Sequence, residues 1–163
     1  MENRNHKDSL FIDLFCKDKE GKQNFISLYN ALHNTNLDLA TTTVQEVNIE
    51  NVLYMALSND IAMLVDNRLV VLVEHQSTIN ENMPLRLLEY VSRIYEQLVP
   101  SEDRYEKKMI KIPYPEFFVF YNGTEDYPVE TELRLSDAFI FPDEKYNVKS
   151  SDLTIEIKVK IIN

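Results

Sequence analysis

The sequence predicts an α/β domain in which helices flank a mixed β-sheet, and three features of the chain support this class. Residues 117–121 form a continuous apolar run that ends at an Asn-Gly pair, which predicts a strand buried on both faces. Residues 61–65 and 69–73 are rich in β-branched residues and enclose a polar break, which is typical of a β-hairpin. Between the hairpin and the buried strand, residues 83–98 place apolar side chains at helical spacing.

Two further helices are expected before the hairpin. Apolar stripes predict them over 8–16 and 22–33, the second beginning after Gly21 interrupts the pattern. His33 lies in a polar context at the end of the second helix, so we expect it to be exposed to solvent. The 83–98 helix gains support from a capping Asn-Glu-Asn stretch and from a proline in its first turn.

The remaining strands are predicted from shorter patterns. Nearly complete alternation of apolar and charged residues over 153–162 predicts a half-buried strand, and spaced valines allow a short strand within 41–49. Residues 124–150 mix turns with apolar stretches. We expect five of their side chains to cover one edge of the sheet: Leu133, Leu135, Phe139, Ile140 and Phe141.

Composition limits the class of protein. The chain has 163 residues, 44% of them hydrophobic and 27% charged, so we treat 1–163 as a single domain with an ordinary core. It has no apolar run of membrane-spanning length and no signal-like N-terminus, so we expect a cytoplasmic protein without membrane contact. Lone Cys16 offers no disulfide partner and is a poor nucleophile candidate. Only two glycines are present, which argues against a phosphate-cradling Gly-rich loop.

The candidate chemistry lies at the two ends of the hairpin, where Asp60 precedes the first strand and Glu74 follows the apolar part of the second. If residues 66–68 form a three-residue loop, Asp60 falls directly opposite Glu74, with Cβ atoms about 5 Å apart. A two-residue loop would instead place Asp60 opposite Val73. The interpretation therefore depends on the three-residue loop.

Strand alternation adds Gln76 to this pair, since Gln76 and Glu74 are two residues apart while His75 points the other way. Oxygen ligands at this spacing suit a hard divalent ion such as Mg²⁺ or Mn²⁺. Glu46 is an additional ligand only if its strand passes the mouth of the hairpin. The alternative is that the carboxylates are strand-end residues turned to water.

A second stripe on the 83–98 helix aligns Arg86, Tyr90 and Arg93 with Gln97. Beside a metal site this stripe suits phosphate binding, and by itself it is an ordinary solvated helix face. The formal net charge of −10 argues against binding nucleic acid by bulk electrostatics. Lysine and arginine concentrate in residues 101–111, which we interpret as a solvated connection.

The sequence EHQST at 74–78, followed by NMPLRLLEYVSRIYE at 82–96, resembles the signature of the recombination-promoting nuclease and putative transposase family, a branch of the PD-(D/E)XK nuclease superfamily. Residues 7–11, 59–60 and 118–123 resemble three more blocks of that family in the same order. The resemblance implies a restriction-endonuclease-like topology. It also implies that the chain lacks a C-terminal helical extension, since family members generally continue into a further helical region.

By this resemblance Asp60 takes the position of the first metal-binding aspartate, Glu74 that of the second acidic ligand, and Gln76 the position usually held by lysine. The implied function is Mg²⁺-dependent hydrolysis of DNA phosphodiester bonds by a deoxyribonuclease that promotes recombination, with the backbone carbonyl of His75 as a further ligand. DNA is the implied partner, and a homodimer is compatible with this function. The alternative is a catalytically silent binding or interaction module, because an uncharged amide replaces the lysine ammonium.

Overall fold

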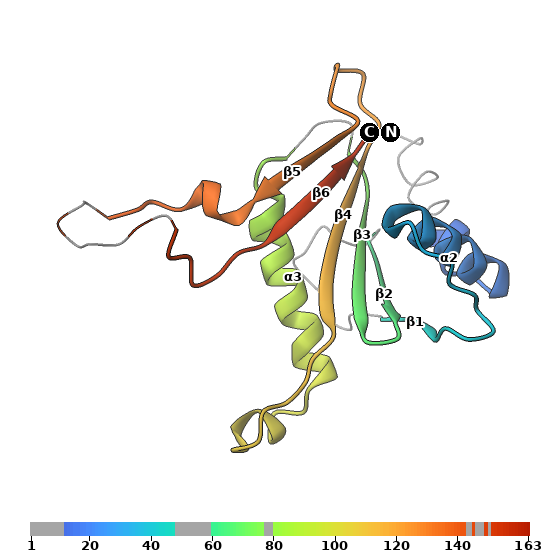
Figure 1. The fold of residues 1–163 in the computed structure, drawn as a ribbon, viewed down its shortest axis with the longest axis horizontal. Coiled ribbons are helices and arrows are strands. Elements are labelled where there is room, and N and C mark those ends of the chain that lie inside the picture. The colour runs from blue at the N-terminus through green and yellow to red at the C-terminus, as the bar shows by residue number, and fades with distance from the viewer. Residues whose placement is uncertain (1–11, 48–59, 77–79, 143–144, 146–148, 150) are drawn as a thin grey trace, which may run out of the picture.

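A six-stranded mixed sheet with helices on both faces organises the chain, which confirms the predicted α/β class and is consistent with a restriction-endonuclease-like architecture (Figure 1). The structure is a computed structural model that describes residues 12–47, 60–76, 80–142, 145, 149 and 151–163; for residues 73–76 it describes the backbone alone. The strands lie in the order β1-β2-β3-β4-β6-β5. Their bounds are Val44–Glu46 (β1), Ile61–Val65 (β2), Arg68–Gln76 (β3), Tyr114–Tyr121 (β4), Glu130–Arg134 (β5) and Lys158–Ile162 (β6).

The sheet combines an antiparallel half with a parallel centre. Strands β1, β2 and β3 pair antiparallel, β3, β4 and β6 pair parallel, and β5 returns antiparallel along the outer edge. The crossover from β3 to β4 is made by helix α3, Met83–Leu98, in agreement with the predicted bounds. Strand β4 has neighbours on both sides and is buried over Phe117, Phe118 and Val119, as its continuous apolar run predicts.

The second helix of the fold, α2, spans Lys19–His33 and begins three residues earlier than predicted. Its start is set by Asp18, whose carboxylate accepts hydrogen bonds from the backbone N–H groups of Glu20 and Gly21 at 2.8 and 3.0 Å. A side chain that satisfies free N–H groups fixes a helix terminus more strongly than a glycine in the first turn weakens it. Residues 12–15 are also helical, within the predicted 8–16 segment.

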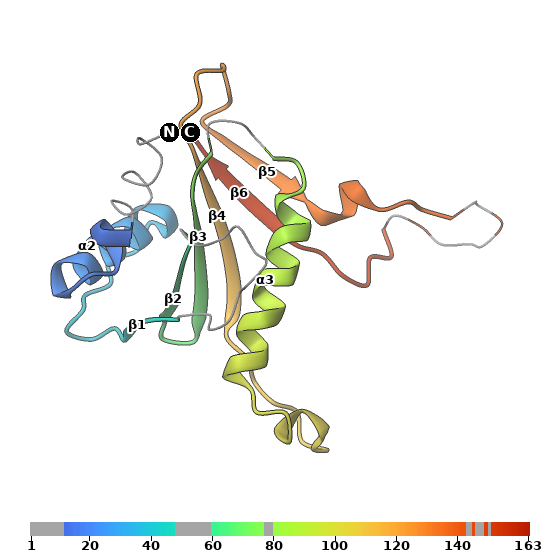
Figure 2. The same ribbon diagram turned by 180° about the vertical axis from the view of Figure 1, so that it is seen from behind.

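Helices α2 and α3 cover opposite faces of the sheet, and each closes its own hydrophobic cluster (Figures 1 and 2). Side chains of β3 alternate between the clusters: Leu69 and Val71 pack on the α3 side, while Val70 and Leu72 pack on the α2 side. The fully buried Leu87 and Ile94 supply the centre of the α3 layer. A residue in a regular part of a strand can therefore be assigned to one of the two faces.

The C-terminal part of the chain differs from expectation in two respects. Strand β6 begins at Lys158 rather than at 153, and Ile155 is 44% exposed. Leu135 is buried as predicted, but Ile140 is 98% exposed, so the edge is formed by β5 rather than covered by this stretch. The apolar pattern predicts a cover for the edge, whereas backbone pairing with β6 places 130–134 in the sheet itself. Among the described helices, none has both the length and the apolar character needed to cross a membrane.

Candidate functional site

The hairpin that carries Asp60 turns through two residues, so the predicted three-residue loop is wrong. Val65 pairs with Arg68, and Ile61 pairs with Leu72. Asp66 adopts a φ of +52°, the left-handed conformation that tight two-residue hairpin turns need at their first loop position. Its carboxylate also accepts a hydrogen bond from the Thr43 N–H at 3.0 Å, which ties the turn to β1. Turn geometry, which the apolar pattern does not report, therefore sets the register.

With this register Asp60 continues β2 at the level of Val73, and the direct opposition of Asp60 and Glu74 is not formed. Ala62, two residues further along β2, packs in the cluster beneath α3, so the alternation of β2 places Asp60 on the α3 face. One oxygen of the Asp60 carboxylate, Oδ2, is fully buried. A buried anionic oxygen at the end of a strand is costly to desolvate, which makes a ligand or catalytic role plausible chemistry for it.

Tyr90 of α3 lies close enough to Asp60 for the two groups to interact electrostatically. Burial raises the pKa of the Tyr90 phenol strongly, and the negative charge of Asp60 raises it further. The ring is only 4% exposed and belongs to the cluster between α3 and the sheet. Tyr90 therefore stays a neutral phenol near the Asp60 carboxylate.

Strand β3 carries an irregularity at the point where the other candidate residues lie. Val73 is in register with Val119, but Gln76 is in register with Tyr121, so three steps along β3 match two along β4. The extra residue is typical of a β-bulge, a feature enriched next to active sites. It interrupts the strict alternation that was used to group Gln76 with Glu74. The backbone register brings Gln76 level with Tyr121, which belongs to the α3-side cluster that also holds Ala62.

The side chains of Glu74, His75 and Gln76 lie outside the described residues, so their roles as ligands or catalytic groups stay predictions. Among the residues that the structure describes, no group of three or more histidine, cysteine, aspartate or glutamate side chains has metal-binding geometry. Asp60 fits a hard cation, because its carboxylate supplies the type of oxygen donor that Mg²⁺ prefers.

Tyr121 and Gly123 belong to this end of the sheet and were not singled out as site residues. The Tyr121 ring is 4% exposed, and its hydroxyl is buried without a hydrogen-bond partner among the described residues. A Cβ atom on Gly123 would lie 2.1 Å from that hydroxyl, so only glycine lets the ring fold back here. The sequence signal was available, because Gly123 is one of only two glycines in the chain.

The proposed phosphate-binding stripe on α3 divides into three different environments. Tyr90 is buried, so it does not lie on one exposed face with Arg93, and its role in binding nucleic acid stays a prediction. The positions 83, 87, 90, 91 and 94 together belong to the buried face of the helix. Tyrosine was counted as polar, although most of its surface is an apolar ring. Arg86 is half-buried with its Nη1 3.2 Å from the sulfur of Met83, and Arg93 is exposed and paired with Glu96 at 2.9 Å.

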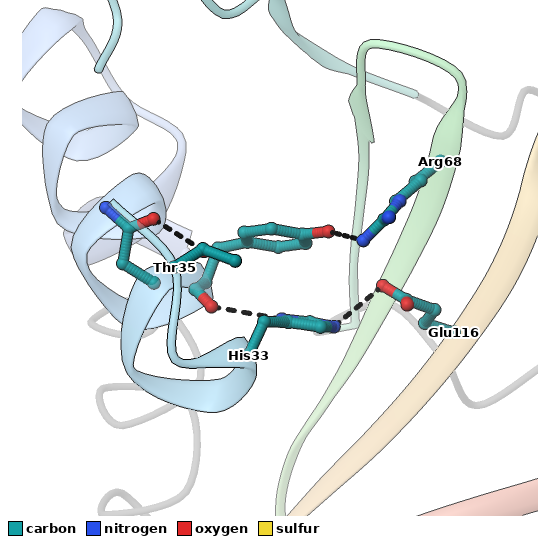
Figure 3. Close-up of polar contacts among 6 residues, drawn as sticks. His33, Thr35, Arg68 and Glu116 are labelled. Carbon is teal, nitrogen blue, oxygen red and sulfur yellow. Dashed lines mark hydrogen bonds and ion pairs between the residues drawn. The ribbon is translucent and has the colours of Figure 1, made fainter. Parts of the chain in front are cut away.

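Two other residues lie away from this site. Glu46 pairs with Met63, whose side chain packs on the α2 face, so Glu46 does not share a face with Asp60. The prediction that His33 is exposed to solvent is wrong. Its ring stacks on Tyr29 at a centroid distance of 4.1 Å, and its Nε2 lies 3.1 Å from the Glu116 carboxylate (Figure 3). Long-range contacts from the sheet reach His33, and the local sequence around it gives no sign of them.

The described part of the site thus consists of a buried carboxylate oxygen, two buried phenols and an interrupted strand on the α3 face. This arrangement can bind a cation through Asp60, and the buried ring of Tyr90 can exclude water on one side of it. It sits at the carboxyl ends of the parallel strands β3 and β4, where ligands bind in open α/β sheets.

Comparison with curated proteins and with solved structures gave no match. A comparison with protein families matched residues 5–158 to the family described as "Putative transposase, YhgA-like". The match covers almost the whole chain, including Asp60, the β3 bulge and α3. This chain therefore belongs to the YhgA-like putative transposase family.

Proposed function

We propose that the protein is a Mg²⁺- or Mn²⁺-dependent deoxyribonuclease that cleaves DNA phosphodiester bonds. The observation that carries this proposal is the buried Asp60 carboxylate oxygen at the level where β3 bulges, in a chain of a transposase-like family. Fold alone would not license it, because α/β sheets serve many unrelated functions. Promotion of recombination, the PD-(D/E)XK relationship and a homodimer belong to the same proposal.

In this proposal Asp60 and Glu74 hold the divalent ion, with the backbone carbonyl of His75 as a further ligand. The ion would lower the pKa of a coordinated water and neutralise charge on the leaving oxygen. Gln76, level with Tyr121 in the backbone register, orients the attacking water through its amide. Tyr90 stays protonated beside Asp60, so it can donate a hydrogen bond but cannot serve as a base.

The test is nicking of supercoiled plasmid by the purified chain with Mg²⁺, with Mn²⁺ and with a chelator. We expect cleavage with either metal and none with the chelator. Asp60→Asn keeps the shape of the side chain but removes its charge, and should lower the rate by about 100-fold or more, the effect expected when a metal ligand is lost. Asp13→Asn is the matched control, because Asp13 is an exposed aspartate in the helical segment 12–15, which packs on the α2 face of the sheet, opposite to that of Asp60.

Folding of the two variants must be compared as well. Replacing a partly buried carboxylate by a neutral amide removes a desolvation cost, so Asp60→Asn should keep or gain thermal stability. Cleavage that persists in Asp60→Asn would contradict the assignment of Asp60. Metal-independent binding of DNA without cleavage in the parent would support the silent module instead, in agreement with the uncharged Gln76 at the lysine position.

A further inference from the structure

The connection between α3 and β4 is the part of the surface that the proposed nuclease site does not use. It runs through the short 3-10 helix η1, Asp103–Tyr105, and projects beyond the end of the sheet where β4 begins (Figure 1). The Tyr95 hydroxyl of α3 donates a 2.7 Å hydrogen bond to the Pro113 carbonyl and anchors the end of the connection. The connection is therefore a positioned element attached to the helix.

Positive charge and exposed apolar side chains are interleaved along this connection. Arg104, Lys107, Lys108 and Lys111 are four of the chain's 17 lysine and arginine residues, and they fall within eight positions that contain one carboxylate. None of the ion pairs formed among the described residues includes them, whereas Arg93 and Arg134 are held by glutamates. Glu102, Asp103 and Glu106 lie among these cations, so residues 101–111 carry a net charge of +1, whereas the chain as a whole carries −10. The connection is therefore a more favourable surface for a polyanion than the chain on average.

The apolar side chains of the connection are exposed to solvent, so they are available for stacking and do not form a core. Tyr105 is 90% exposed, Met109 is 75% exposed and Tyr114 is 66% exposed. Between the connection and α3 lies a hollow of about 550 Å³. Its lining combines the apolar Met109, Ile110 and Ile112 with three cations, Arg104, Lys107 and Lys108, and three carboxylates, Glu96, Asp103 and Glu106. Apolar walls beside unpaired cations fit a flat base attached to a phosphate.

We infer that the α3–β4 connection binds single-stranded nucleic acid, with Arg104, Lys107 and Lys108 on successive phosphates and an unpaired base in the hollow. Tyr105 supplies a second surface on which a base can stack, as aromatic side chains do in single-strand-binding proteins. Asp103 and Glu106 also line the hollow, and carboxylates accept hydrogen bonds from the amino group of cytosine. Thymine has no such amino group, so cytosine-rich strands should be preferred.

This surface is separate from the metal site. Ile61, next to Asp60, is level with Leu72 and Phe118, while the connection enters β4 at Tyr114. Four residues of strand span about 13 Å, and the connection then extends further in the opposite direction (Figure 2). Binding here does not require cleavage, so the inference goes beyond the proposed function and can hold when that function fails.

Fluorescence anisotropy with labelled oligonucleotides in the presence of a chelator tests the inference without any cleavage. We expect oligo(dC) to bind more tightly than oligo(dT) and than a duplex of equal length. Lys107→Ala with Lys108→Ala should weaken binding and reduce the slope of log K against log [salt] by about 1.4, since each lost phosphate contact contributes roughly 0.7 on a single strand. The control is Lys19→Ala with Lys149→Ala, which removes the same charge from exposed positions elsewhere.

Stacking is tested separately with Tyr105→Ala, which should weaken binding by roughly 5- to 100-fold while leaving the salt slope unchanged. Equal affinity of the Lys107/Lys108 variant and its control would overturn the inference. So would binding to phosphatidylserine vesicles without binding to oligonucleotides, because the surface would then serve a membrane. Equal binding of oligo(dT), or of duplex, would overturn the placement of a base in the hollow.

Discussion

The two faces of the sheet treat buried polar groups in different ways. On the α2 side the groups lie against charged or polar neighbours: the Arg68 guanidinium donates to the Tyr29 hydroxyl, and the Glu116 Oε2 lies 3.1 Å from the His33 Nε2, although it accepts no regular hydrogen bond from the described residues (Figure 3). On the α3 side the Tyr121 hydroxyl is buried without a hydrogen-bond partner among the described residues. Paired groups stabilise a helix on a sheet, whereas an unsatisfied buried group in a native structure calls for a functional explanation.

The polar groups on the two faces of the sheet also lie at opposite ends of β3 and β4. Interactions on the α2 side connect the helix to the starts of β3 and β4, at Arg68 and Glu116, and have no need of an outside ligand. Groups on the α3 side gather at the other ends of those strands, beside the β3 bulge. Substitutions on the α2 side should therefore change the free energy of unfolding, and substitutions at the site should change activity more than folding.

The largest effect is expected at Gln76. If its amide orients the attacking water, Gln76→Ala should lower DNA cleavage by about 10- to 1000-fold, as expected for one positioned group. Gln76→Lys should cleave as fast as the parent or faster, because two nearby carboxylates would favour the charged ammonium. Single-turnover cleavage measures the rates of both variants, with Gln23→Ala at an exposed position of α2 as the control. An inactive Gln76→Lys variant that no longer responds to metal would instead make Gln76 a ligand.

The two glycines of the chain offer the next contrast. Gly123→Ala places a methyl group 2.1 Å from the Tyr121 hydroxyl and should destabilise the fold by about 1–3 kcal/mol, the usual cost of overpacking. Gly21→Ala brings its methyl 3.0 Å from the Cys16 nitrogen, but alanine favours the helix by about 1 kcal/mol, so the net change should be close to zero. Urea unfolding of the two variants and the parent measures these changes in the free energy of unfolding. Equal losses would show that the Tyr121 ring moves aside without cost.

The same substitution on each face gives a smaller and more direct comparison. Tyr29→Phe leaves the Arg68 guanidinium without its acceptor on the α2 side and should cost about 1 kcal/mol. Tyr90→Phe keeps the buried ring and removes only the hydroxyl, so it should change the free energy of unfolding by less than about 0.5 kcal/mol. It should nevertheless slow DNA cleavage, since the phenol lies beside Asp60. The reverse ranking of stabilities would show that the α3 side is the structural one.

The smallest expected effect is a pH-dependent change in stability. It concerns Glu156, a hydrogen-bonded carboxylate in the chain between β5 and β6. Burial alone would raise the pKa of Glu156, but hydrogen bonds from the Ser136 hydroxyl and N–H and from the Ile157 N–H outweigh it, so the pKa falls below the ordinary value of 4.5. A depressed folded-state pKa contributes stability above the unfolded value, and this contribution is lost as pH falls through the folded value.

Ser136→Ala should therefore lower the melting temperature slightly at pH 7 and make no difference once the pH is well below the folded pKa of Glu156. Melting curves between pH 3 and pH 7 follow the two proteins, with Ser151→Ala at an exposed serine as the control. A constant difference across this range would mean that Ser136 acts through packing rather than through the Glu156 charge.

Local sequence was sufficient for the elements whose pattern is carried within one segment. The bounds of α3 follow from its apolar spacing and the proline in its first turn, and the central place of β4 follows from its unbroken apolar run. The position of Asp60 directly before β2 could also be predicted from the sequence. The family was indicated by contiguous motifs, which are themselves local, and the match over residues 5–158 confirms it.

Tertiary structure alone decided how these segments align. The two-residue turn at Asp66 shifts the hairpin register by one residue from the predicted one, and the β3 bulge shifts Gln76 relative to its predicted face. A change in register at one pair of residues changes which face every later side chain of that strand occupies. Burial of Tyr90 and the His33–Glu116 pair likewise depend on surfaces supplied by distant segments. The sequence determines which residues can carry charge or pack in a core, but only the alignment of strands and helices determines which of these residues contact one another.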